Sequence, residues 1–494
     1  MKNIFKLFSI VMLSVITVAC SDDYLDVNTD PNNPLTTSPD LLLPVAQRYS
    51  AYTITTPPGG ARRLNTLGNL MMYNWSQSDG YSWYQSEFEY RVNSTFYSTI
   101  WDYQYQAALK QYHTFDVDTE NYEYYTAIAK IMKSFHFQIL VDTYGDIPYF
   151  EALLRGENPT PAFDDALTVY EDLIVQLDNA IALINAGNAN GDVLNPGGAD
   201  IMYAGDMNEW KKFANTVKLR ILVRQSDMAG RSGYLTTEFQ KIANEGSGFI
   251  TDNATANPGY TDQEDQQSPF WGNYGQTTAG EYVNNYFATC ATPFVLDKLT
   301  DFNDPRIDYI YEEPEDGHLG VVQGLDFYPP GGLLTEPFVS NIGPGLLKSA
   351  EQNSVIFSLA EAEFLQAEAA LKTYLSGAQQ HYENGIAASF DYLGVPNAAG
   401  YYTQPIDLVS WGSTSNKLEA IITQKWIALN GLDAIQSWYD FSRTGYPSNL
   451  PISLLSPEPT RPVRLAYPSS EISGNGANVP AQPNVFTSKI FWAN

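Results

Sequence analysis

Residues 121–150 read NYEYYTAIAKIMKSFHFQILVDTYGDIPYF, and their apolar pattern decides the fold. Apolar side chains recur there at intervals of three or four residues, at Ile128, Ile131, Met132, Phe135, Ile139 and Leu140. This spacing lines one side of a helix with apolar groups, while Lys130, Lys133 and Gln138 point elsewhere. The helix is expected to end at Gly145, and Pro148 prevents it from restarting at once. The sequence therefore predicts a long buried helix followed by a rigid corner.

Other amphipathic stretches indicate a mostly helical chain. Helices are expected at 41–51, 163–187, 208–228, 354–375, 378–391 and 416–441, with a further apolar stripe at 96–112. Ala166-x3-Tyr170 and Ala378-x3-Tyr382 each begin a helix that follows a long apolar one. This Ala-x3-aromatic spacing occurs in tetratricopeptide repeats, where a small residue lets paired helices approach closely. The expected fold class is mostly α, with a tetratricopeptide-like scaffold of helix pairs.

The N-terminus has the features of an exported lipoprotein. Lys2 and Lys6 precede an apolar run at 7–19 that is too short to span a bilayer, so residues 1–19 are expected to be a signal peptide. Cys20 follows Thr-Val-Ala and resembles the cysteine of a bacterial lipobox. We therefore expect Cys20 to be acylated and to anchor the protein in a membrane. The alternative is a plain signal peptide with an incidental cysteine.

The rest of the chain divides into a tether and one domain. Residues 20–40 are polar and rich in turn residues, which favours an extended, lipidated tether. Residues 41–494 are expected to form a single domain, with a helical scaffold mainly at 96–228 and 354–444. Residues 245–350 are rich in Gly, Pro, Tyr and Asp, and so long an irregular region inside a compact protein is usually a functional surface or short strands.

Charge restricts the possible partners. The 494 residues carry a formal net charge of −29, and the sequence pI is about 4.3. Nucleic acid and anionic lipid surfaces both require basic patches, so neither is expected to bind by charge. Cys290 is the only cysteine besides Cys20, so an acylated chain cannot form an internal disulfide and depends on its core for stability. An acidic, tyrosine-rich surface suits a neutral ligand.

Two aromatic stretches are the candidate ligand contacts. The candidates are Tyr73, Trp75, Tyr81, Trp83 and Tyr84 in the first stretch and Trp271 and Tyr274 in the second. These rings lie among polar residues without helical period, and flat rings offer large, rigid contact area to a sugar face or a peptide side chain. The alternative is that they anchor loops to the body. In contrast, Trp101, Trp210, Trp426 and Trp438 lie on helical stripes and are expected in the core.

No motif marks an active site, a metal site or a cofactor site. His113, His136, His318 and His381 are dispersed without a ligand spacing typical of zinc, so no metal is expected. No nucleophile elbow occurs, and no cofactor motif is found. Fifty-six Asp and Glu residues leave a secreted helical glycoside hydrolase or lyase as the alternative to a binding protein. Asp142, Asp146 and Asp304 are interpreted as helix and turn caps.

Eight motifs occur in one order along nearly the whole chain. They are YLDVN at 24–28, YGDIP at 144–148, EWKKFAN at 209–215, DPR at 304–306, LAEAE at 359–363, IITQKWIAL at 421–429, RTGYP at 443–447 and RLAYP at 464–468. Together they resemble the SusD/RagB family of outer-membrane nutrient-binding lipoproteins, in its SusD-like branch. Ser442 stands where a second Arg is common, and Ala466 where Pro is frequent; neither departure changes the resemblance.

The resemblance implies a specific function. It implies a tetratricopeptide-like scaffold with an irregular, loop-rich face that holds ligand, and no catalytic activity. Members of this family lie on the cell surface over a SusC-like TonB-dependent outer-membrane transporter and deliver oligosaccharides or peptides to it. Ser21-Asp22-Asp23 resembles the acidic surface-export signal of such lipoproteins. The resemblance thus implies a lipid-anchored protein of the outer membrane that takes part in nutrient uptake.

Overall fold

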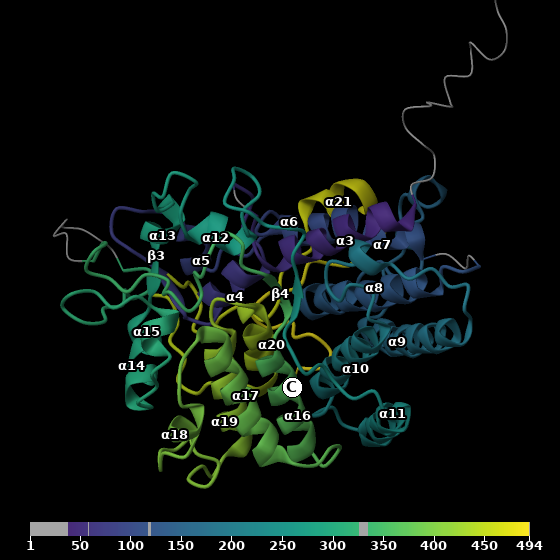
Figure 1. The fold of residues 1–494 in the computed structure, drawn as a ribbon. Helices are drawn as coiled ribbons and strands as arrows, with labels where there is room; N and C mark the ends of the chain where they lie inside the picture. The colour runs from purple at the N-terminus through teal and green to yellow at the C-terminus, as the bar shows by residue number, and fades with distance from the viewer. Residues whose placement is uncertain (1–37, 58, 117–119, 326–333, 494) are drawn as a thin grey trace, which may run out of the picture.

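The structure is a computed structural model that describes residues 38–57, 59–116, 120–325 and 334–493. The predicted signal peptide, Cys20 and most of the tether lie outside these ranges. Two regions can be distinguished in Figure 1: long helices gather at the right and bottom, and short helices with irregular segments gather at the left. Within the described ranges, none of the helices combines the length and the apolar character needed to cross a bilayer.

The stretch at 121–150 forms the predicted long helix, α8 (Glu123–Tyr144). Gly145 follows it with φ of 79° and donates its N–H to the carbonyl of Val141, which closes the last turn. The chain then turns and enters α9 (Ala166–Ala189), which packs along α8 (Figure 1). Asp165 caps α9 by accepting the N–H of Thr168 at 2.9 Å, and Asp146 accepts that of Ala166 at 2.9 Å.

A second helix pair repeats this arrangement. In it, α16 (Leu359–Leu371) packs along α17 (Ala378–Leu393), and α10 (Met207–Arg224) lies against both α9 and α16. Gly385 in α17 makes the close approach possible, because an added Cβ would lie 2.9 Å from the ring of Phe364. Tyr170 and Tyr382, the two aromatic residues of the Ala-x3-Tyr steps, are fully buried in their pairs. The predicted mostly helical, tetratricopeptide-like class is confirmed.

Three expected elements differ from the structure. Residues 354–375 are not one helix: the β-branched and aromatic residues at the start form strand β4 (Ser354–Phe357), and α16 begins after Ser358, whose hydroxyl caps Glu361. Residues 416–441 are two helices, α19 (Lys417–Leu429) and α20 (Ala434–Thr444), separated at Gly431 with φ of 79°. The 96–112 stripe is α6 (Ser98–Tyr103), the π-helical turn η1 (Gln104–Leu109) and α7 (Lys110–Phe115).

The predicted first helix is confirmed and is longer than expected, as α3 (Pro39–Ile54). The remaining helices of the described ranges are α4 (Leu64–Met71), α5 (Gln85–Phe88), α11 (Ser232–Glu245), α12 (Pro269–Tyr274), α13 (Asn284–Ala288), α14 (Pro293–Asp301), α15 (Ile307–Ile310), α18 (Ala398–Tyr402) and α21 (Ser469–Asn475), with 3-10 turns η2 (Arg155–Glu157) and η3 (Gly197–Ala199). Most of the short ones lie in the region at the left of Figure 1.

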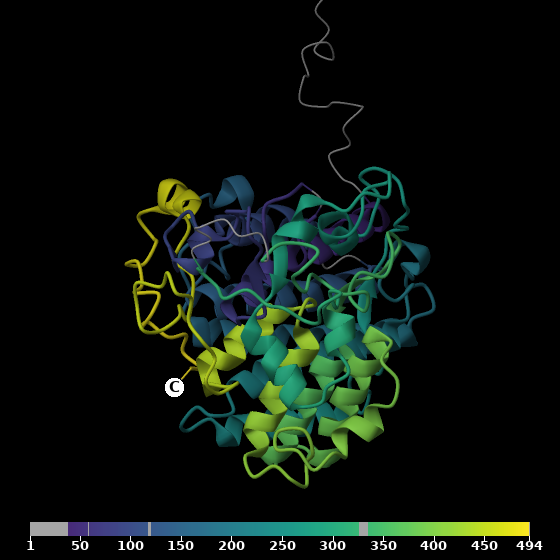
Figure 2. The ribbon, with the colours of Figure 1, turned by 90° about the vertical axis from the view of Figure 1, so that its left-hand side faces the viewer.

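The strands form two small antiparallel ribbons. In one, β1 (Trp75–Gln77) pairs with β3 (Thr289–Ala291), and in the other, β2 (Ala254–Ala256) pairs with β4. Both ribbons join segments that are far apart in the sequence. The view in Figure 2 shows the irregular segments lying above the helices of the second pair. These short pairings, rather than an extended sheet, hold the loop-rich region in place.

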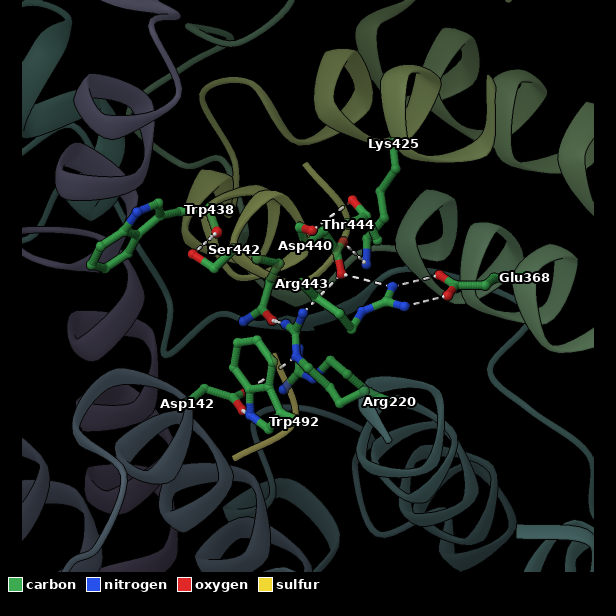
Figure 3. A network of polar contacts seen from close by, with 12 residues as sticks. Asp142, Arg220, Glu368, Lys425, Trp438, Asp440, Ser442, Arg443, Thr444 and Trp492 are labelled. Atoms are coloured by element: carbon green, nitrogen blue, oxygen red, sulfur yellow. Dashed lines mark hydrogen bonds and ion pairs between the residues drawn. The ribbon is translucent and has the colours of Figure 1, made fainter. Parts of the chain in front are cut away.

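The helical region has a core that contains many charges. The four tryptophans expected in the core, Trp101, Trp210, Trp426 and Trp438, are all buried there, so that prediction is confirmed. Among them lies a network of buried ion pairs (Figure 3). Arg443 lies between Glu368 and Asp440 in this network, at 2.7 and 3.5 Å. Lys425 contacts the other oxygen of Asp440 at 2.9 Å.

Asp142 belongs to this network, so its interpretation as a cap was wrong. Its carboxylate is fully buried and accepts from Arg224 Nε at 3.2 Å and from Trp492 Nε1 at 2.9 Å. Arg224 also contacts Asp440 at 2.8 Å, which links α8, α10 and α20. The other two carboxylates act as expected: Asp146 caps α9, and Asp304 accepts the N–H of Arg306 in a turn while also pairing with its guanidinium.

Candidate ligand-binding site

The ribbon of β1 and β3 brings the first predicted aromatic stretch beside a segment that precedes β3. Its register pairs Trp75 with Ala291 and Gln77 with Thr289. Because the strands are antiparallel, the end of β1 lies beside the start of β3, and the N–H of Ser78 donates to the carbonyl of Ala288 at 3.1 Å. The segments at 78–84 and 282–288 therefore leave the same end of the ribbon. About 200 residues of sequence separate them, so their proximity is a tertiary property.

Four of the seven predicted contact residues are buried: Tyr73, Trp75, Tyr84 and Tyr274. The rings of Trp75 and Tyr274 pack edge to face, 5.2 Å between centroids. The hydroxyls of Tyr84 and Tyr274 each have a threonine partner, Thr289 for Tyr84 at 2.7 Å and Thr66 for Tyr274 at 2.8 Å. The surroundings of these two tyrosines thus satisfy both the ring and the polar tip, whereas the buried Nε1 of Trp75 has no hydrogen-bond partner among the described residues. Burial of these four rings fits the alternative, in which they anchor the loops, and the prediction that they contact ligand stays a prediction.

The other three predicted residues, Tyr81, Trp83 and Trp271, are partly exposed. Tyr81 and Trp83 contact each other edge to face, with 5.2 Å between centroids. Gln77 holds their loop in shape, because its Oε1 accepts the backbone N–H of Trp83 at 2.5 Å and that of Tyr84 at 3.0 Å. Its Nε2 donates to the carbonyl of Tyr81. The buried side chain of Gln77 therefore fixes two rings at the surface.

An additional pair of rings was missed by the sequence analysis. Tyr282 is 41% exposed and stacks on Tyr286, with centroids 4.1 Å apart and ring planes 20° apart. Phe287 lies against both rings. The residues Tyr81, Trp83, Tyr282 and Phe287, at one end of the β1–β3 ribbon, are called the aromatic shelf below. The i, i+4 spacing of Tyr282 and Tyr286 was the available signal.

A cavity of about 440 Å³ lies in the same region. It is lined by Thr56, Gly60, Ala61, Arg62, Tyr84, Thr95, Tyr97, Ser98, Thr99, Asn273, Tyr274 and Asn285. These residues come from four separate parts of the chain: the segment after α3, Tyr84 just before α5, the segment that leads into α6, and α12 with α13. Its wall thus includes Tyr84 and Tyr274, two of the predicted residues. Hydroxyls and amides dominate the remainder, which provides both hydrogen-bond donors and acceptors.

The cavity has one charged lining residue, Arg62, and a buried carboxylate neutralises it. Arg62 Nη1 lies 3.1 Å from Glu87 Oε1, and the guanidinium lies over the ring of Tyr84 at 4.6 Å. The hydroxyl of Tyr97 also donates to Glu87, at 2.9 Å. Burial raises the pKa of Glu87, and the nearby Arg62 acts in the opposite direction. Two further lining residues contact each other, because the side-chain amide of Asn285 donates to Asn273 at 2.8 Å.

This arrangement is suited to binding rather than to hydrolysis. Glycoside hydrolysis requires two carboxyl groups that flank the scissile bond. Among the residues that line the cavity in the described part of the chain there is no Asp or Glu. Glu87 lies behind Arg62, with its side chain only 3% exposed. The chemistry of the cavity is therefore hydrogen bonding to a neutral, polar ligand, beside rings that can stack.

Comparisons with known proteins agree with this architecture. Residues 31–468 match the family model SusD-like_2, which is described as starch-binding associating with outer membrane. No curated protein matches the chain. The structure resembles a chitin-binding SusD homologue from Flavobacterium johnsoniae, at 22% identity and a TM-score of 0.72, over 92% of this chain and 98% of that one.

Two further solved structures have the same fold. A SusD homologue from Bacteroides uniformis matches with a TM-score of 0.70 and 23% identity, over 92% of this chain and 99% of that one. A SusD-like protein from Bacteroides thetaiotaomicron matches with a TM-score of 0.69 and 23% identity, over 92% and 99%. The family match covers most of the described body. The chain therefore belongs to the SusD-like family of non-catalytic, nutrient-binding proteins of the outer membrane.

Proposed function

We propose that this protein captures oligosaccharides at the aromatic shelf and in the adjacent cavity, and delivers them to a partner SusC-like TonB-dependent transporter. The observation that carries the proposal is the cavity beside the shelf: hydroxyl and amide groups line it, and its one cation is already paired. A sugar presents hydroxyls around its edge and an apolar face, so it matches both parts. A peptide is the second candidate, because rings also accept apolar side chains.

Two features favour a neutral glycan over a charged ligand. The chain carries a net charge of −29, which repels anionic ligands at long range. In the cavity, Arg62 is neutralised by Glu87, so a ligand carboxylate would have to compete with an existing ion pair. The chitin-binding homologue from Flavobacterium johnsoniae, which has the same fold, makes chitin oligosaccharides the first ligands to test.

The proposed mechanism is physical and makes no covalent bond. Trp83 and Tyr282 stack against sugar faces, while Asn273, Asn285 and Thr99 exchange hydrogen bonds with hydroxyls. The ligand must be released to the transporter, so moderate affinity suits this role better than tight binding. The proposal includes the N-terminal organisation expected from sequence: a signal peptide at 1–19, lipidation at Cys20, a tether at 20–40 and one domain at 41–494.

Binding of defined oligosaccharides by isothermal titration calorimetry tests the proposal. Chitin and starch oligosaccharides and a mixed-sequence peptide are titrated into the purified protein and into the Trp83→Ala, Tyr282→Ala double variant. We expect binding of at least one glycan, and a loss of at least tenfold in the variant. The matched control is Phe150→Ala, which removes a 51% exposed ring outside the shelf and should not change affinity.

Several results would contradict the proposal. Peptide binding without glycan binding would favour the second candidate. Equal affinity in the shelf variant would place the site elsewhere. Shortened oligosaccharides after prolonged incubation would indicate catalysis and would refute delivery of an unaltered ligand.

A further inference from the structure

Three metal-binding side chains meet at the turn that follows α15. One ligand atom each from Asp308, Glu313 and His318 lies within 4.8 Å of the others. Asp308 comes from α15, and a tight turn returns the chain, because the N–H of Gly317 donates to the carbonyl of Pro314 at 3.0 Å with φ of 92° at Gly317. The three residues are spaced by five, which matches no helical ligand motif, so only the fold brings them together.

His318 is held in an orientation that suits a ligand. Its Nδ1 lies 2.9 Å from the hydroxyl of Ser340, and its Nε2 lies 3.0 Å from Asp308 Oδ1. Ser340 is fully buried, and its oxygen also accepts the backbone N–H of Leu319 at 3.1 Å, which fixes the hydroxyl in place. Metal-bound histidines usually hydrogen-bond through the nitrogen that does not bind the metal. Without a metal, Nε2 donates its proton to the Asp308 carboxylate. When a metal ion binds, the imidazole can carry its proton on Nδ1 and donate it to Ser340, which leaves the Nε2 lone pair for the ion.

We propose that Asp308, Glu313 and His318 bind one divalent transition-metal ion, with Zn²⁺ as the best fit. One imidazole with two carboxylates is a donor set for zinc, with water completing a tetrahedron. Two ligands about 2.0 Å from zinc in a tetrahedron lie about 3.3 Å apart. His318 Nε2 and Asp308 Oδ1, at 3.0 Å, are already close to that separation, and the remaining ligand atoms need to close by at most about 1.5 Å. Asp308 and Glu313 are exposed and free to rotate, while His318, 13% exposed, is the fixed member.

The site is connected to the aromatic shelf through Glu312, the neighbour of Glu313. The hydroxyl of Tyr286 donates to the Glu312 carboxylate, and Tyr282 of the shelf stacks on Tyr286. A metal ion on Glu313 would fix the segment that carries Glu312. We therefore infer that the metal rigidifies the support of the shelf and does not contact the ligand. This proposal goes beyond ligand capture, and its first test does not need a glycan.

Titration calorimetry with Zn²⁺ tests the site on the purified full chain after removal of metals with a chelator. We expect one Zn²⁺ per chain, and a loss of at least about 100-fold in affinity in His318→Gln, because removal of a ligand exceeds the 10–100-fold loss typical of a partner behind a ligand. Asp308→Asn should lose at least about tenfold. The matched control is His381→Gln, a partly exposed histidine paired with Glu363 at 2.7 Å, and this variant should bind Zn²⁺ like the parent.

Several results of these titrations would overturn the proposed zinc site. No Zn²⁺ binding by the parent chain, or equal affinity in His318→Gln, would overturn the proposal. A site that binds Ca²⁺ and is indifferent to His318→Gln would also overturn it, because it would not use the imidazole. Thermal unfolding without metal should be the same for Asp308→Asn and the parent, since that side chain is 58% exposed, and this shows that lost binding is not lost folding. With binding established, Zn²⁺ should also raise the unfolding temperature of the parent but not of His318→Gln.

Discussion

The helical region and the loop-rich region of this protein are stabilised by different chemistry. In the helical region, Arg224, Asp440 and Arg443 form a chain of ion pairs buried between helices. In the loop-rich region the ion pairs are separate, as for Arg62 with Glu87 and Arg306 with Asp304. Around the cavity, rings pack on rings and hydroxyls bond to hydroxyls, as Tyr274 does with Trp75 and Thr66. A buried charge network requires every partner to be in place, so it specifies one arrangement of helices. The neutral contacts leave nearby amides and hydroxyls available for a ligand.

The two kinds of chemistry predict different effects of substitutions in the two regions. Although burial opposes ionisation, Lys425, Arg224 and Arg443 hold the pKa of Asp440 well below its usual range. Together these cations keep that carboxylate charged inside the protein. On the shelf, a ring can be removed without leaving a charge unpaired. Substitutions in the network are expected to act on stability, and substitutions on the shelf are expected to act on binding.

The largest effect is expected from Arg224→Ala, which breaks the network at its centre. Asp142 and Asp440 lose a shared cation that lies 3.2 and 2.8 Å away, and a buried charge without its partner costs about 3–5 kcal/mol. Urea unfolding measures this loss. The control is Lys241→Ala, whose ammonium is half exposed; its partner Glu238, at 2.8 Å, keeps Lys218 at 2.9 Å, so the variant should cost less than about 1 kcal/mol. Equal losses in the two variants would remove the distinction between the regions.

Two tryptophan variants distinguish a buried ring that supports the site from a partly exposed ring at its surface. Trp75→Ala removes a fully buried ring and should lower the free energy of unfolding by about 3–5 kcal/mol. Trp83→Ala should lower it by less than about 1 kcal/mol and should weaken glycan binding roughly tenfold, because it removes a partly exposed stacking ring. Chemical denaturation and calorimetry on both variants measure the two effects. If Trp83→Ala were as destabilising as Trp75→Ala, Trp83 would be a structural ring like Trp75 and not a ligand contact.

Two buried groups give the unfolding free energy opposite pH dependences. Burial lowers the pKa of His136 to about 3, so its contribution is complete above about pH 6.5 and is lost as pH falls. Burial, with a smaller effect of Glu361, raises the pKa of Asp433 to about 7. Its contribution is complete below about pH 3.8 and is lost as pH rises to about 7.

Between about pH 4 and 6.5 the two slopes, about 1.4 kcal/mol per pH unit each, should largely cancel. His136→Gln should therefore make stability fall with rising pH over this window, and Asp433→Asn should make it rise. Unfolding by urea at several pH values measures both slopes. The same slope in both variants would show that these two groups do not set the pH dependence.

A smaller effect than that of Arg224→Ala or Trp75→Ala is expected from Gly431→Ala, at the break between α19 and α20. The residue has φ of 79°, and an added Cβ would lie 2.4 Å from Leu346 Cδ1. We expect a loss of more than about 1 kcal/mol, from backbone strain together with the displaced leucine. Thermal unfolding measures the loss. Gly394→Ala, at φ of 79° with open space around it, is the control that isolates the strain from the contact.

Local patterns were sufficient to predict much of the helical region. The spacing of Ile128, Met132 and Phe135 predicted α8, since a helix buries residues three and four apart whatever lies opposite. The spacing of apolar residues did not reveal that β4 replaces the start of one expected helix, because short apolar runs suit both a strand and a buried helix. It also gave no sign of the partners of Asp142, which come from distant helices and from Trp492.

The ligand-binding site was predicted less well, because its geometry also depends on contacts between segments that are distant in the sequence. The sequence identified stretches rich in aromatic residues, but it could not tell that Trp75 faces the core and that Trp83, eight residues further on, lies partly at the surface. That difference depends on the pairing of β1 with β3, which is a long-range contact. The sequence by itself determined the family, the helical scaffold and the absence of a disulfide within an acylated chain. Only the tertiary structure decided which rings are exposed, which residues line the cavity and that His318 meets two carboxylates, because each requires segments distant in sequence to meet.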